Sequence, residues 1–315
     1  MKISIQTSKI LGTLNNQYTL LEKLDFGATS MVYKVLDNKT GEIKVAKIFS
    51  ENSNLAFQKE MDIFKSISDL ECVIKIFAYG NGILSKEGNE VSINYIILEY
   101  AKGSLLKYME NLNNVFSLDT IIYLSYQFIK AIDCLHKKGI SHRDLKIENV
   151  LLVGNNFSVK LCDFGLSKSF INENKKKIKF KDSELVGSPF HYPPEILNKK
   201  AYEGEKSDIF SSGISLFSLM TGKFPFEEAT IKDKVYKLIC LNKIKEFWDL
   251  VDRDNLLSSQ FKDLFIKMVA YYPKERPSLD EILNFPFFEK LRNPNEETIA
   301  YYQNIIEKEL GKINI

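Results

Sequence analysis

The residues best suited to chemistry lie in the segment 142–149, which reads His-Arg-Asp-Leu-Lys-Ile-Glu-Asn. The Asp144 carboxylate can accept a proton, the oxygen atoms of Asp144 and Asn149 can bind a hard divalent cation, and Lys146 lies between the two residues. Further along, Asp163 begins the sequence Asp-Phe-Gly, between an apolar run and a polar loop. Phosphoryl transfer requires metal ligands, cations near the phosphates and a base for the attacking hydroxyl. The two segments together supply all three kinds of group.

Both segments resemble motifs of the protein kinase family, namely the catalytic loop and the metal-binding Asp-Phe-Gly motif. The resemblance implies that Asp144 accepts the proton of the substrate hydroxyl and that Lys146 reaches the transferring phosphate. It also implies that Asn149 and Asp163 bind Mg²⁺ beside the phosphates of ATP. A lysine two positions after the catalytic aspartate is typical of kinases that act on serine and threonine, whereas tyrosine kinases usually carry alanine or arginine there.

Two charged residues upstream complete the expected phosphate site. Lys47 lies in a β-type run, residues 43–49, where the family keeps the lysine that binds the α- and β-phosphates. Glu60 lies in a stretch with one apolar helical face and is the expected partner of Lys47. Either residue alone would more simply be a surface charge. Their order and spacing relative to the other motifs favour the functional interpretation.

The resemblance also assigns an adenine site. Residues 96–101 resemble the last strand of the small lobe and the hinge, with Leu98 as gatekeeper and the backbone of Glu99 and Ala101 facing adenine. The apolar side chains on either side of the adenine ring would be Val32, Val45 and Leu151. The internal spine that aligns the lobes would consist of Phe64, Ile76, His142 and Phe164. For these apolar residues, packing in a core and contact with adenine predict the same sequence pattern.

The glycine-rich loop departs from the family pattern. Residues 24–32 keep the middle glycine, Gly27, but carry Asp25 and Ser30 where the family has the first and third glycines. Glycine lets the backbone fold closely over phosphates, and Ser30 is a tolerable replacement. Asp25, however, brings a carboxylate near a polyanion. At ~8 Å and an effective dielectric constant of about 20–40 the repulsion is on the order of 1–2 kcal/mol, which weakens ATP binding about tenfold without abolishing it.

Downstream, residues 187–195 resemble the Gly-Thr-Pro-x-Tyr-x-Ala-Pro-Glu block that closes the kinase activation segment and seats the protein substrate. The resemblance pairs Glu195 with Arg276 as a largely buried ion pair, and it makes Asp208 an acceptor for the backbone of the catalytic loop. Removing one partner of a buried ion pair costs roughly 3–5 kcal/mol. These are structural rather than catalytic roles.

Arg143, directly before Asp144, indicates regulation through the activation segment. Kinases with arginine at this position usually need an anion on that segment to neutralise it. The anion is commonly a phosphothreonine three residues before the glycine of the block, where this chain has Glu184, preceded by Ser183. Lys168 is placed like the second cation of the same pocket. We expect Glu184 to replace the phosphate in part and phosphorylated Ser183 to add to it, while a solvated loop glutamate is the alternative.

The pattern along the chain predicts an α+β fold. Short β-type runs, hairpin turns at 38–41 and 86–89 and one amphipathic helix come first, and long helical patterns follow residue 103. The resemblance implies that these parts form the bilobal protein kinase fold, with a small antiparallel β-sheet lobe containing one main helix and a larger, mainly helical lobe. The expected boundaries are an N-terminal extension at 1–17, the small lobe at 18–98, a hinge at 99–103, the large lobe at 104–290 and a tail helix at 291–315.

The composition is that of a globular protein, with 315 residues, 44 % hydrophobic, 27 % charged and a formal net charge of +2. Such a balanced charge gives no indication of a nucleic-acid partner, and no apolar run reaches the ~18 residues of a membrane span. The cysteines at 72, 134, 162 and 240 stand far apart, which predicts reduced thiols in an intracellular protein. We therefore expect a monomeric protein in the cytoplasm, with the nucleus left open, and the resemblance to kinases implies a catalytic domain that uses ATP and Mg²⁺ on protein substrates.

Two other functions fit parts of the pattern. The broken glycine loop suits a pseudokinase scaffold that binds nucleotide or partners without efficient turnover. Pseudokinases usually lose at least one of the four central polar residues, which are all present here: Lys47, Asp144, Asn149 and Asp163. A small-molecule phosphotransferase of related fold would lack the 187–195 block and the Glu195–Arg276 pair. Both alternatives are therefore less favoured than a serine/threonine protein kinase.

Overall fold

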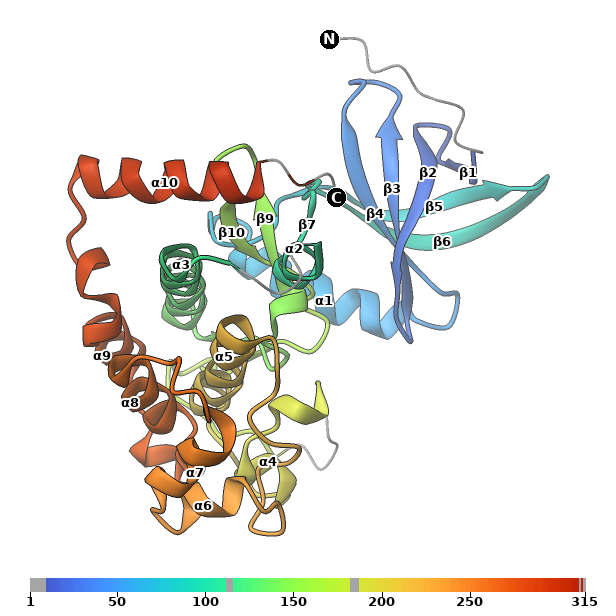
Figure 1. The fold of residues 1–315 in the computed structure, drawn as a ribbon. Helices are drawn as coiled ribbons and strands as arrows, with labels where there is room; N and C mark the ends of the chain where they lie inside the picture. Colours follow the sequence, from blue (N-terminus) through green and yellow to red (C-terminus); the bar gives the residue numbers. More distant parts are fainter. Residues whose placement is uncertain (1–9, 112–115, 182–186, 312, 314–315) are drawn as a thin grey trace. The chain divides into compact units, whose positions relative to one another are not determined.

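The computed structural model describes residues 10–111, 116–181, 187–311 and 313, and the chain divides after Ala101 into two compact units (Figure 1). The first unit is rich in β-strands and the second in α-helices. This arrangement confirms the α+β prediction.

In the first unit, six antiparallel strands form a closed barrel in the order β1-β2-β3-β4-β6-β5. They are β1 (Gly12–Leu14), β2 (Tyr18–Phe26), β3 (Ser30–Asp37), β4 (Ile43–Phe49), β5 (Ile76–Lys86) and β6 (Asn89–Leu98). The turns predicted at 38–41 and 86–89 join β3 to β4 and β5 to β6. β1 lies within the segment assigned above to an N-terminal extension, but it pairs with both β2 and β5 and so closes the barrel.

The helix of this unit, α1 (Asn54–Ile67), buries one stripe of side chains at helical spacing. The stripe consists of Phe57, Glu60, Met61, Phe64 and Ile67. Glu60 is the polar member of the stripe, and a buried carboxylate needs a partner of opposite charge.

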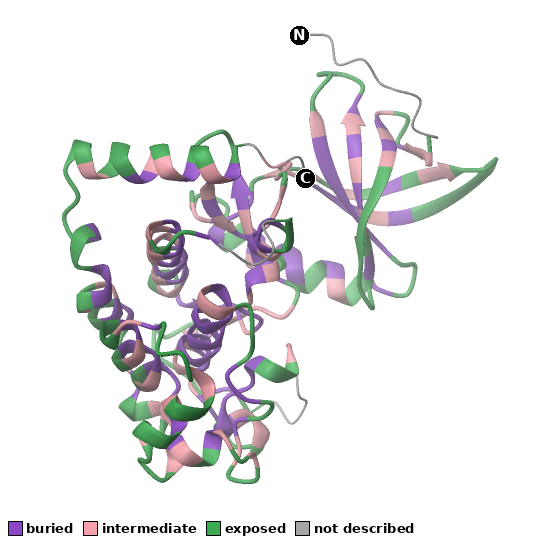
Figure 2. Ribbon diagram, in the orientation of Figure 1, coloured by how far each residue is buried: buried purple, intermediate pink, exposed green. Residues whose placement is uncertain are grey.

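The second unit is built around two long helices, α3 (Leu118–Lys137) and α5 (Gly204–Thr221). The Ser117 hydroxyl accepts the Thr120 N–H at 3.2 Å and so caps the start of α3. Almost every residue of α5 is buried, which is why its sequence is apolar or small nearly all round. Figure 2 shows α5 mostly in the colour of buried residues and α3 in a mixture of the buried and intermediate colours.

Smaller elements surround this pair. The helices are α2 (Leu105–Asn111), α4 (Pro194–Leu197), α6 (Tyr236–Cys240), α7 (Ile244–Val251), α8 (Ser259–Met268), α9 (Leu279–Leu283) and α10 (Glu296–Leu310). The 3₁₀ turns are η1 (Ile147–Asn149), η2 (Pro189–His191), η3 (Pro273–Glu275) and η4 (Pro286–Leu291). Strands β7 (Gly103–Ser104), β9 (Val150–Val153) and β10 (Ser158–Leu161) form one small sheet, and β8 (Ile140–Ser141) pairs with β11 (Lys168–Ser169).

The tail helix α10 packs on α3. Tyr302 is 1 % exposed and stacks on Tyr123 with ring centroids 5.2 Å apart. The Tyr301 hydroxyl donates to Asp119 Oδ2 at 2.7 Å, and the Ser117 N–H donates to Glu309 Oε2 at 3.2 Å. Hydrophobic and polar contacts therefore both hold α10 against α3 within the second unit.

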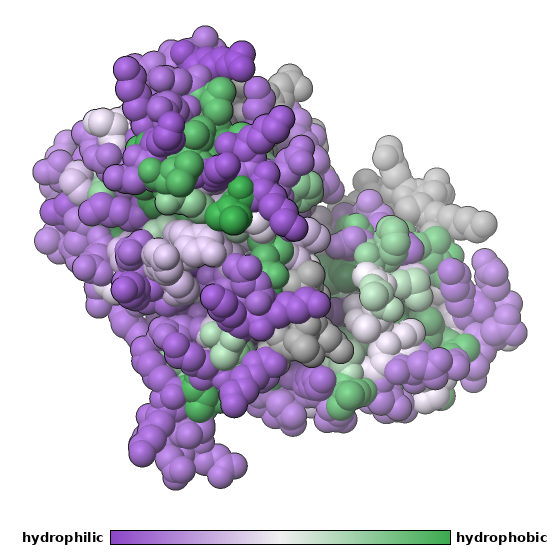
Figure 3. All heavy atoms as spheres, turned by 90° about the horizontal axis from the view of Figure 1, so that it is seen from below, coloured by the Kyte–Doolittle hydropathy of each residue, from purple (hydrophilic) through white to green (hydrophobic). Residues whose placement is uncertain are grey.

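The surface view in Figure 3 is mainly hydrophilic, with hydrophobic side chains gathered in a few areas. Among the described residues, none of the helices combines the length and the apolar character needed to cross a bilayer.

Candidate active site

The catalytic-loop segment 142–149 follows β8 and is anchored to α5 through Asp208. The buried Asp208 carboxylate accepts the backbone N–H groups of His142 and Arg143, each at 2.9 Å, and lies 2.8 Å from His136 Nε2. Burial by itself would raise the pKa of Asp208, but the hydrogen bond and attraction from His136, together with the Arg143 N–H, outweigh burial and lower the pKa. Asp208 is therefore ionised and holds the loop in place.

Asp144 belongs to a hydrogen-bonded set with Lys146, Asn149 and Ser188. The Ser188 hydroxyl donates to Asp144 Oδ1 at 2.9 Å and accepts from Lys146 Nζ at 2.9 Å. Lys146 Nζ also lies 3.3 Å from Asp144 Oδ2. Asn149 Nδ2 donates to the Asp144 carbonyl at 2.8 Å and to Oδ2 at 3.1 Å. The Asp144 carboxylate is thus held in one orientation by three neighbours.

Gly187 brings Ser188 against the catalytic loop. Its φ is +102°, and an added Cβ would lie 2.7 Å from the Arg143 carbonyl oxygen and 3.3 Å from Asp144 Oδ1. Cβ atoms do not approach a backbone oxygen so closely, so this position requires glycine. Ser188 is a site residue that the sequence analysis did not single out. Its place directly after the glycine of the 187–195 block was the signal that could have identified it.

The backbone brings Asn149 next to Asp163, because the N–H of Cys162 donates to the Asn149 carbonyl at 3.1 Å. Asn149 directs its amide nitrogen to Asp144, which leaves the amide oxygen as the group able to bind a cation. Asp163 has a φ of +60°, a conformation that costs on the order of 1–3 kcal/mol in a residue with a Cβ and recurs at functional sites. A carboxylate and an amide oxygen are hard ligands that suit Mg²⁺ with water and phosphate oxygens as its remaining ligands.

In the first unit, Lys47 on β4 forms an ion pair with Glu60 on α1. Lys47 Nζ lies 2.7 Å from Oε1 and 2.8 Å from Oε2 of Glu60. The two side chains are 11 % and 3 % exposed. Since an unpaired charge so deeply buried would be strongly unfavourable, each residue requires the other. The pair accounts for a glutamate on the buried face of α1 and fixes the position of the ammonium group.

The turn between β2 and β3 carries the remnant of the glycine-rich loop. The Gly27 N–H donates to the Ser30 carbonyl at 2.8 Å, and Ser30 is 8 % exposed. Asp25 is exposed, and its Oδ1 accepts the Phe26 N–H at 2.7 Å.

The residues expected around adenine fall in both units. In the barrel, the ladder pairs Val32 with Lys47 and Val45 with Leu98. The expected adenine residues of the first unit are Val32, Val45, Leu98, Glu99 and Ala101. The remaining one, Leu151, lies half-buried on β9 in the second unit. Of the expected spine, Phe64 is buried on α1 and Ile76 half-buried on β5, while His142 and Phe164 contact each other at a centroid distance of 5.0 Å.

Glu195 and Arg276 form a bidentate ion pair inside the second unit. Nη1 of Arg276 lies 2.6 Å from Oε1 of Glu195, and Nη2 lies 2.7 Å from Oε2. The remaining donors of Arg276 reach the carbonyls of Ala270 at 3.0 Å and Lys206 at 2.8 Å. The Arg276 and Glu195 side chains are 0 % and 6 % exposed. The pair therefore ties the end of the 187–195 block to η3.

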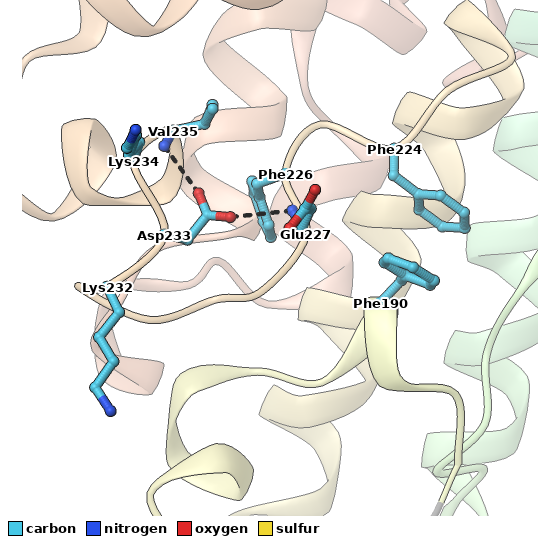
Figure 4. Close-up of a pocket in the computed structure, with 8 residues that line it drawn as sticks. All are labelled: Phe190, Phe224, Phe226, Glu227, Lys232, Asp233, Lys234 and Val235. Atoms are coloured by element: carbon cyan, nitrogen blue, oxygen red, sulfur yellow. Dashed lines mark hydrogen bonds between the residues drawn. The ribbon is translucent and has the colours of Figure 1, made fainter.

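A pocket of about 470 Å³ opens beside the same block (Figure 4). Phe190 and Phe224 stack at its edge with centroids 4.7 Å apart, and they are 46 % and 45 % exposed. Asp233 shapes the opposite wall by accepting the N–H groups of Glu227 at 3.2 Å and Val235 at 2.8 Å. The pocket is also lined by Phe226, Lys232 and Lys234. The pocket thus combines exposed aromatic rings with charged groups.

Of the expected regulatory residues, Arg143 and Lys168 are described, whereas Ser183 and Glu184 lie outside the described residues. Arg143 has a φ of +69°, and its Nη1 donates to the Leu166 carbonyl at 3.3 Å. Both cations lie over the ring of Phe180, a residue that the sequence analysis did not consider.

Comparison with known proteins agrees with this geometry. A family model described as a protein kinase domain matches residues 18–288. The chain therefore belongs to the protein kinase family, and the resemblance seen in its catalytic-loop and Asp-Phe-Gly segments is confirmed.

Several curated relatives are named as protein kinases. CBL-interacting protein kinase 11 of Oryza sativa subsp. japonica is 29 % identical over 281 residues, which is 88 % of this chain and 52 % of that protein. The serine/threonine-protein kinase SAPK2 of Oryza sativa subsp. indica is 32 % identical over 212 residues, 67 % of this chain and 60 % of its own length. The serine/threonine-protein kinase SRK2F of Arabidopsis thaliana is 33 % identical over 202 residues, which is 62 % of this chain and 54 % of that protein. The chain thus spans little more than half the length of these relatives.

Proposed function

We propose that this protein is a kinase that transfers the γ-phosphoryl group of ATP to serine or threonine hydroxyls of protein substrates and that it depends on Mg²⁺. The observation that carries the proposal is the hydrogen-bonded set of Asp144, Lys146, Asn149 and Ser188. A serine hydroxyl already donates to Asp144 Oδ1 at 2.9 Å, which is the contact that a substrate hydroxyl needs with a general base.

In the proposed reaction, the substrate hydroxyl oxygen forms a bond to the γ-phosphorus while the bond from that phosphorus to the β–γ bridging oxygen breaks, and ADP leaves. Asp144 accepts the hydroxyl proton, and Lys146 lies where it can offset charge on the transferring phosphoryl group. Asn149 and Asp163 would hold Mg²⁺, which when bound neutralises part of the phosphate charge.

The first unit contributes the nucleotide-binding groups in this proposal. Lys47, held by Glu60, binds the α- and β-phosphates, and the Gly27–Ser30 turn covers them. The residues of this unit that the resemblance assigns to the adenine ring are Val32, Val45, Leu98, Glu99 and Ala101. Asp25 lowers ATP affinity without removing any of these groups.

The pocket at Phe190 would accept an apolar side chain of the protein substrate. Phe190 follows Ser188 by two residues, and two residues span at most ~7 Å, so a segment whose hydroxyl reaches Asp144 passes close to the exposed rings. Peptides with leucine or phenylalanine just after the target serine should therefore be preferred to peptides with aspartate there. Phe190→Ala should remove that preference while leaving the KM for ATP unchanged.

The rival interpretation is a pseudokinase scaffold, motivated by Asp25 in the glycine-rich loop. The two interpretations separate in one assay, in which the protein, a generic protein substrate, ATP labelled at the γ-phosphate and Mg²⁺ are incubated, and the labelled amino acids are identified after hydrolysis. The kinase proposal expects phosphoserine and phosphothreonine that disappear when EDTA is added. Nucleotide binding with no transfer to any substrate would support the scaffold instead.

A further inference from the structure

Phe180 occupies an unusual place in the activation segment, because its ring is buried and two cations lie over it. The side chain is 1 % exposed. The guanidinium carbon of Arg143 lies 5.3 Å from the ring centroid, and Lys168 Nζ lies 5.1 Å from it. Cations at these distances are attracted by the face of an aromatic ring, and the attraction is strongest where water is excluded. The ring therefore contacts both cations that the sequence analysis assigned to an anion pocket.

The main chain holds Phe180 as firmly as the ring does. Its N–H donates to the Tyr202 carbonyl at 2.8 Å, and the Tyr202 N–H donates back to the Phe180 carbonyl at 3.0 Å. The two rings meet edge to face at 5.5 Å, and both pack with the buried Phe170. The Tyr202 hydroxyl in turn accepts a hydrogen bond from Arg143 Nε at 3.0 Å. Arg143 is thus held by the ring of one residue and the hydroxyl of the other.

Ion pairs extend this pairing on both sides of the contact. Lys179 Nζ lies 3.0 Å from Glu203 Oε1, and Lys177 pairs with Glu205. The basic run of the activation segment is therefore joined to the residues that lead into α5, and two of its lysines are engaged within the protein.

Gly204, the first residue of α5, makes room for the ring. An added Cβ there would lie 2.5 Å from Phe180 Cε2 and 2.7 Å from Ser141 Cβ. A side chain larger than hydrogen would displace the ring. Phe180, Tyr202 and Gly204 form one fitted contact, which we call the Phe180 clasp.

We propose that the Phe180 clasp positions Arg143 and residues 177–181 of the activation segment for catalysis, and that these residues hold this position without phosphorylation. The inference rests on the kinase function proposed above and adds a positioning residue and a mode of regulation to it. Arg143 precedes Asp144 in the chain, and its carbonyl lies against Gly187, so a shift of Arg143 moves both the base and Ser188. Phe180 does not touch a reacting group and acts through Arg143.

The clasp predicts the behaviour of three variants. Phe180→Leu keeps a buried apolar side chain but removes the aromatic face. Tyr202→Phe keeps the ring and removes only the hydroxyl that Arg143 Nε contacts. Phe261→Leu is the matched control, because Phe261 is also 1 % exposed in the second unit but packs against Phe265 and Phe287, far from the activation segment in the chain.

All proteins are treated with phosphatase, confirmed phosphate-free by mass spectrometry, and digested briefly with trypsin under native conditions. Phe180→Leu loses the attraction between the ring and the two cations over it. Trypsin should therefore cleave this variant within Lys175–Lys181 faster than the wild type, on the order of tenfold. The same variant should lose kcat by a similar factor, with the KM for ATP unchanged. Tyr202→Phe should show both effects more weakly, and Phe261→Leu should show neither, although its Tm falls.

The inference is overturned if Phe180→Leu and Tyr202→Phe match the wild type in cleavage rate. It is also overturned if phosphate-free wild type binds ATP but gains activity only after phosphorylation of the segment. The cleavage assay does not depend on phosphate transfer. If the protein transfers no phosphate in any state, the kinase proposal is refuted, but the digestion still shows whether the Phe180 clasp holds the segment. Should Phe180→Leu fail to fold, Tyr202→Phe carries the same test.

Discussion

The buried ion pair of Glu195 and Arg276 gives a prediction whose size can be derived from the contacts. In Glu195→Ala, Nη1 and Nη2 of Arg276 lose their carboxylate acceptors at 2.6 and 2.7 Å. Arg276 keeps its bonds to the carbonyls of Ala270 and Lys206. A charge left unpaired in such a site destabilises a protein by roughly 3–5 kcal/mol.

For a unit of this size, a change of that magnitude lowers the midpoint of thermal unfolding by about 10 °C. The double variant Glu195→Ala/Arg276→Met replaces both charges with apolar groups and should be more stable than either Glu195→Ala or Arg276→Met, because no charge is left buried. The measurement is urea unfolding of the wild type, the two single variants and the double variant, which forms a complete thermodynamic cycle.

The single variants should also lose kcat, because the pair ties the substrate-seating block to the core. If each single variant costs less than 1 kcal/mol, or if the two losses simply add in the double variant, the description of a mutually dependent buried pair is wrong.

Three further predictions concern individual residues. Asp163→Asn should abolish most Mg²⁺-dependent turnover with an unchanged Tm, because it removes a ligand charge and not a core group; wild-type turnover in that variant contradicts the metal assignment. Lys47→Met should raise the KM for ATP and lower kcat while leaving the uncompensated Glu60 buried, so its Tm should fall as well, and Lys47→Met/Glu60→Leu should recover the Tm but not the activity. Burial lowers the pKa of His191 to about 4, so between pH 6.5 and 4 the unfolded chain binds a proton that the folded protein does not. As the pH is lowered through that range, the free energy of unfolding of the wild type should fall more steeply than that of His191→Tyr, by about 1.4 kcal/mol per pH unit. Urea unfolding at each pH measures the difference, and parallel profiles of the two proteins would contradict this prediction.

The order of elements and the two buried ion pairs, Lys47–Glu60 and Glu195–Arg276, could be predicted because both follow from patterns visible in the sequence. The apolar side chains of α1 recur at helical spacing and so predict a helix. The catalytic-loop and Asp-Phe-Gly segments carry their polar groups at fixed positions along the chain. The strand β1 was missed because three residues, of which Leu14 is fully buried, form no recognisable alternation. Its strand character comes from partners in β2 and β5 that lie elsewhere in the sequence.

The Phe180 clasp could not be predicted for the same reason. A single phenylalanine between lysines suggests nothing by its type. Its role depends on Arg143, Lys168 and Tyr202, which approach it only in the folded chain. Ser188 could be predicted only in part. Its position in the 187–195 block is visible in the sequence, but its hydrogen bond to Asp144 is seen only in the structure.

The most direct test of the central proposal is single-turnover transfer from γ-labelled ATP to a serine-containing protein substrate, with and without Mg²⁺, in wild type and in Asp144→Asn. The variant keeps the shape of the side chain and can still accept a hydrogen bond from Ser188, but it cannot take the proton of the substrate hydroxyl. We expect Mg²⁺-dependent phosphoserine in the wild type and a rate lower by a factor of roughly 10²–10⁴ in Asp144→Asn, with a KM for ATP changed only slightly. Equal rates in the two proteins, or no transfer by wild type that demonstrably binds ATP, would contradict it.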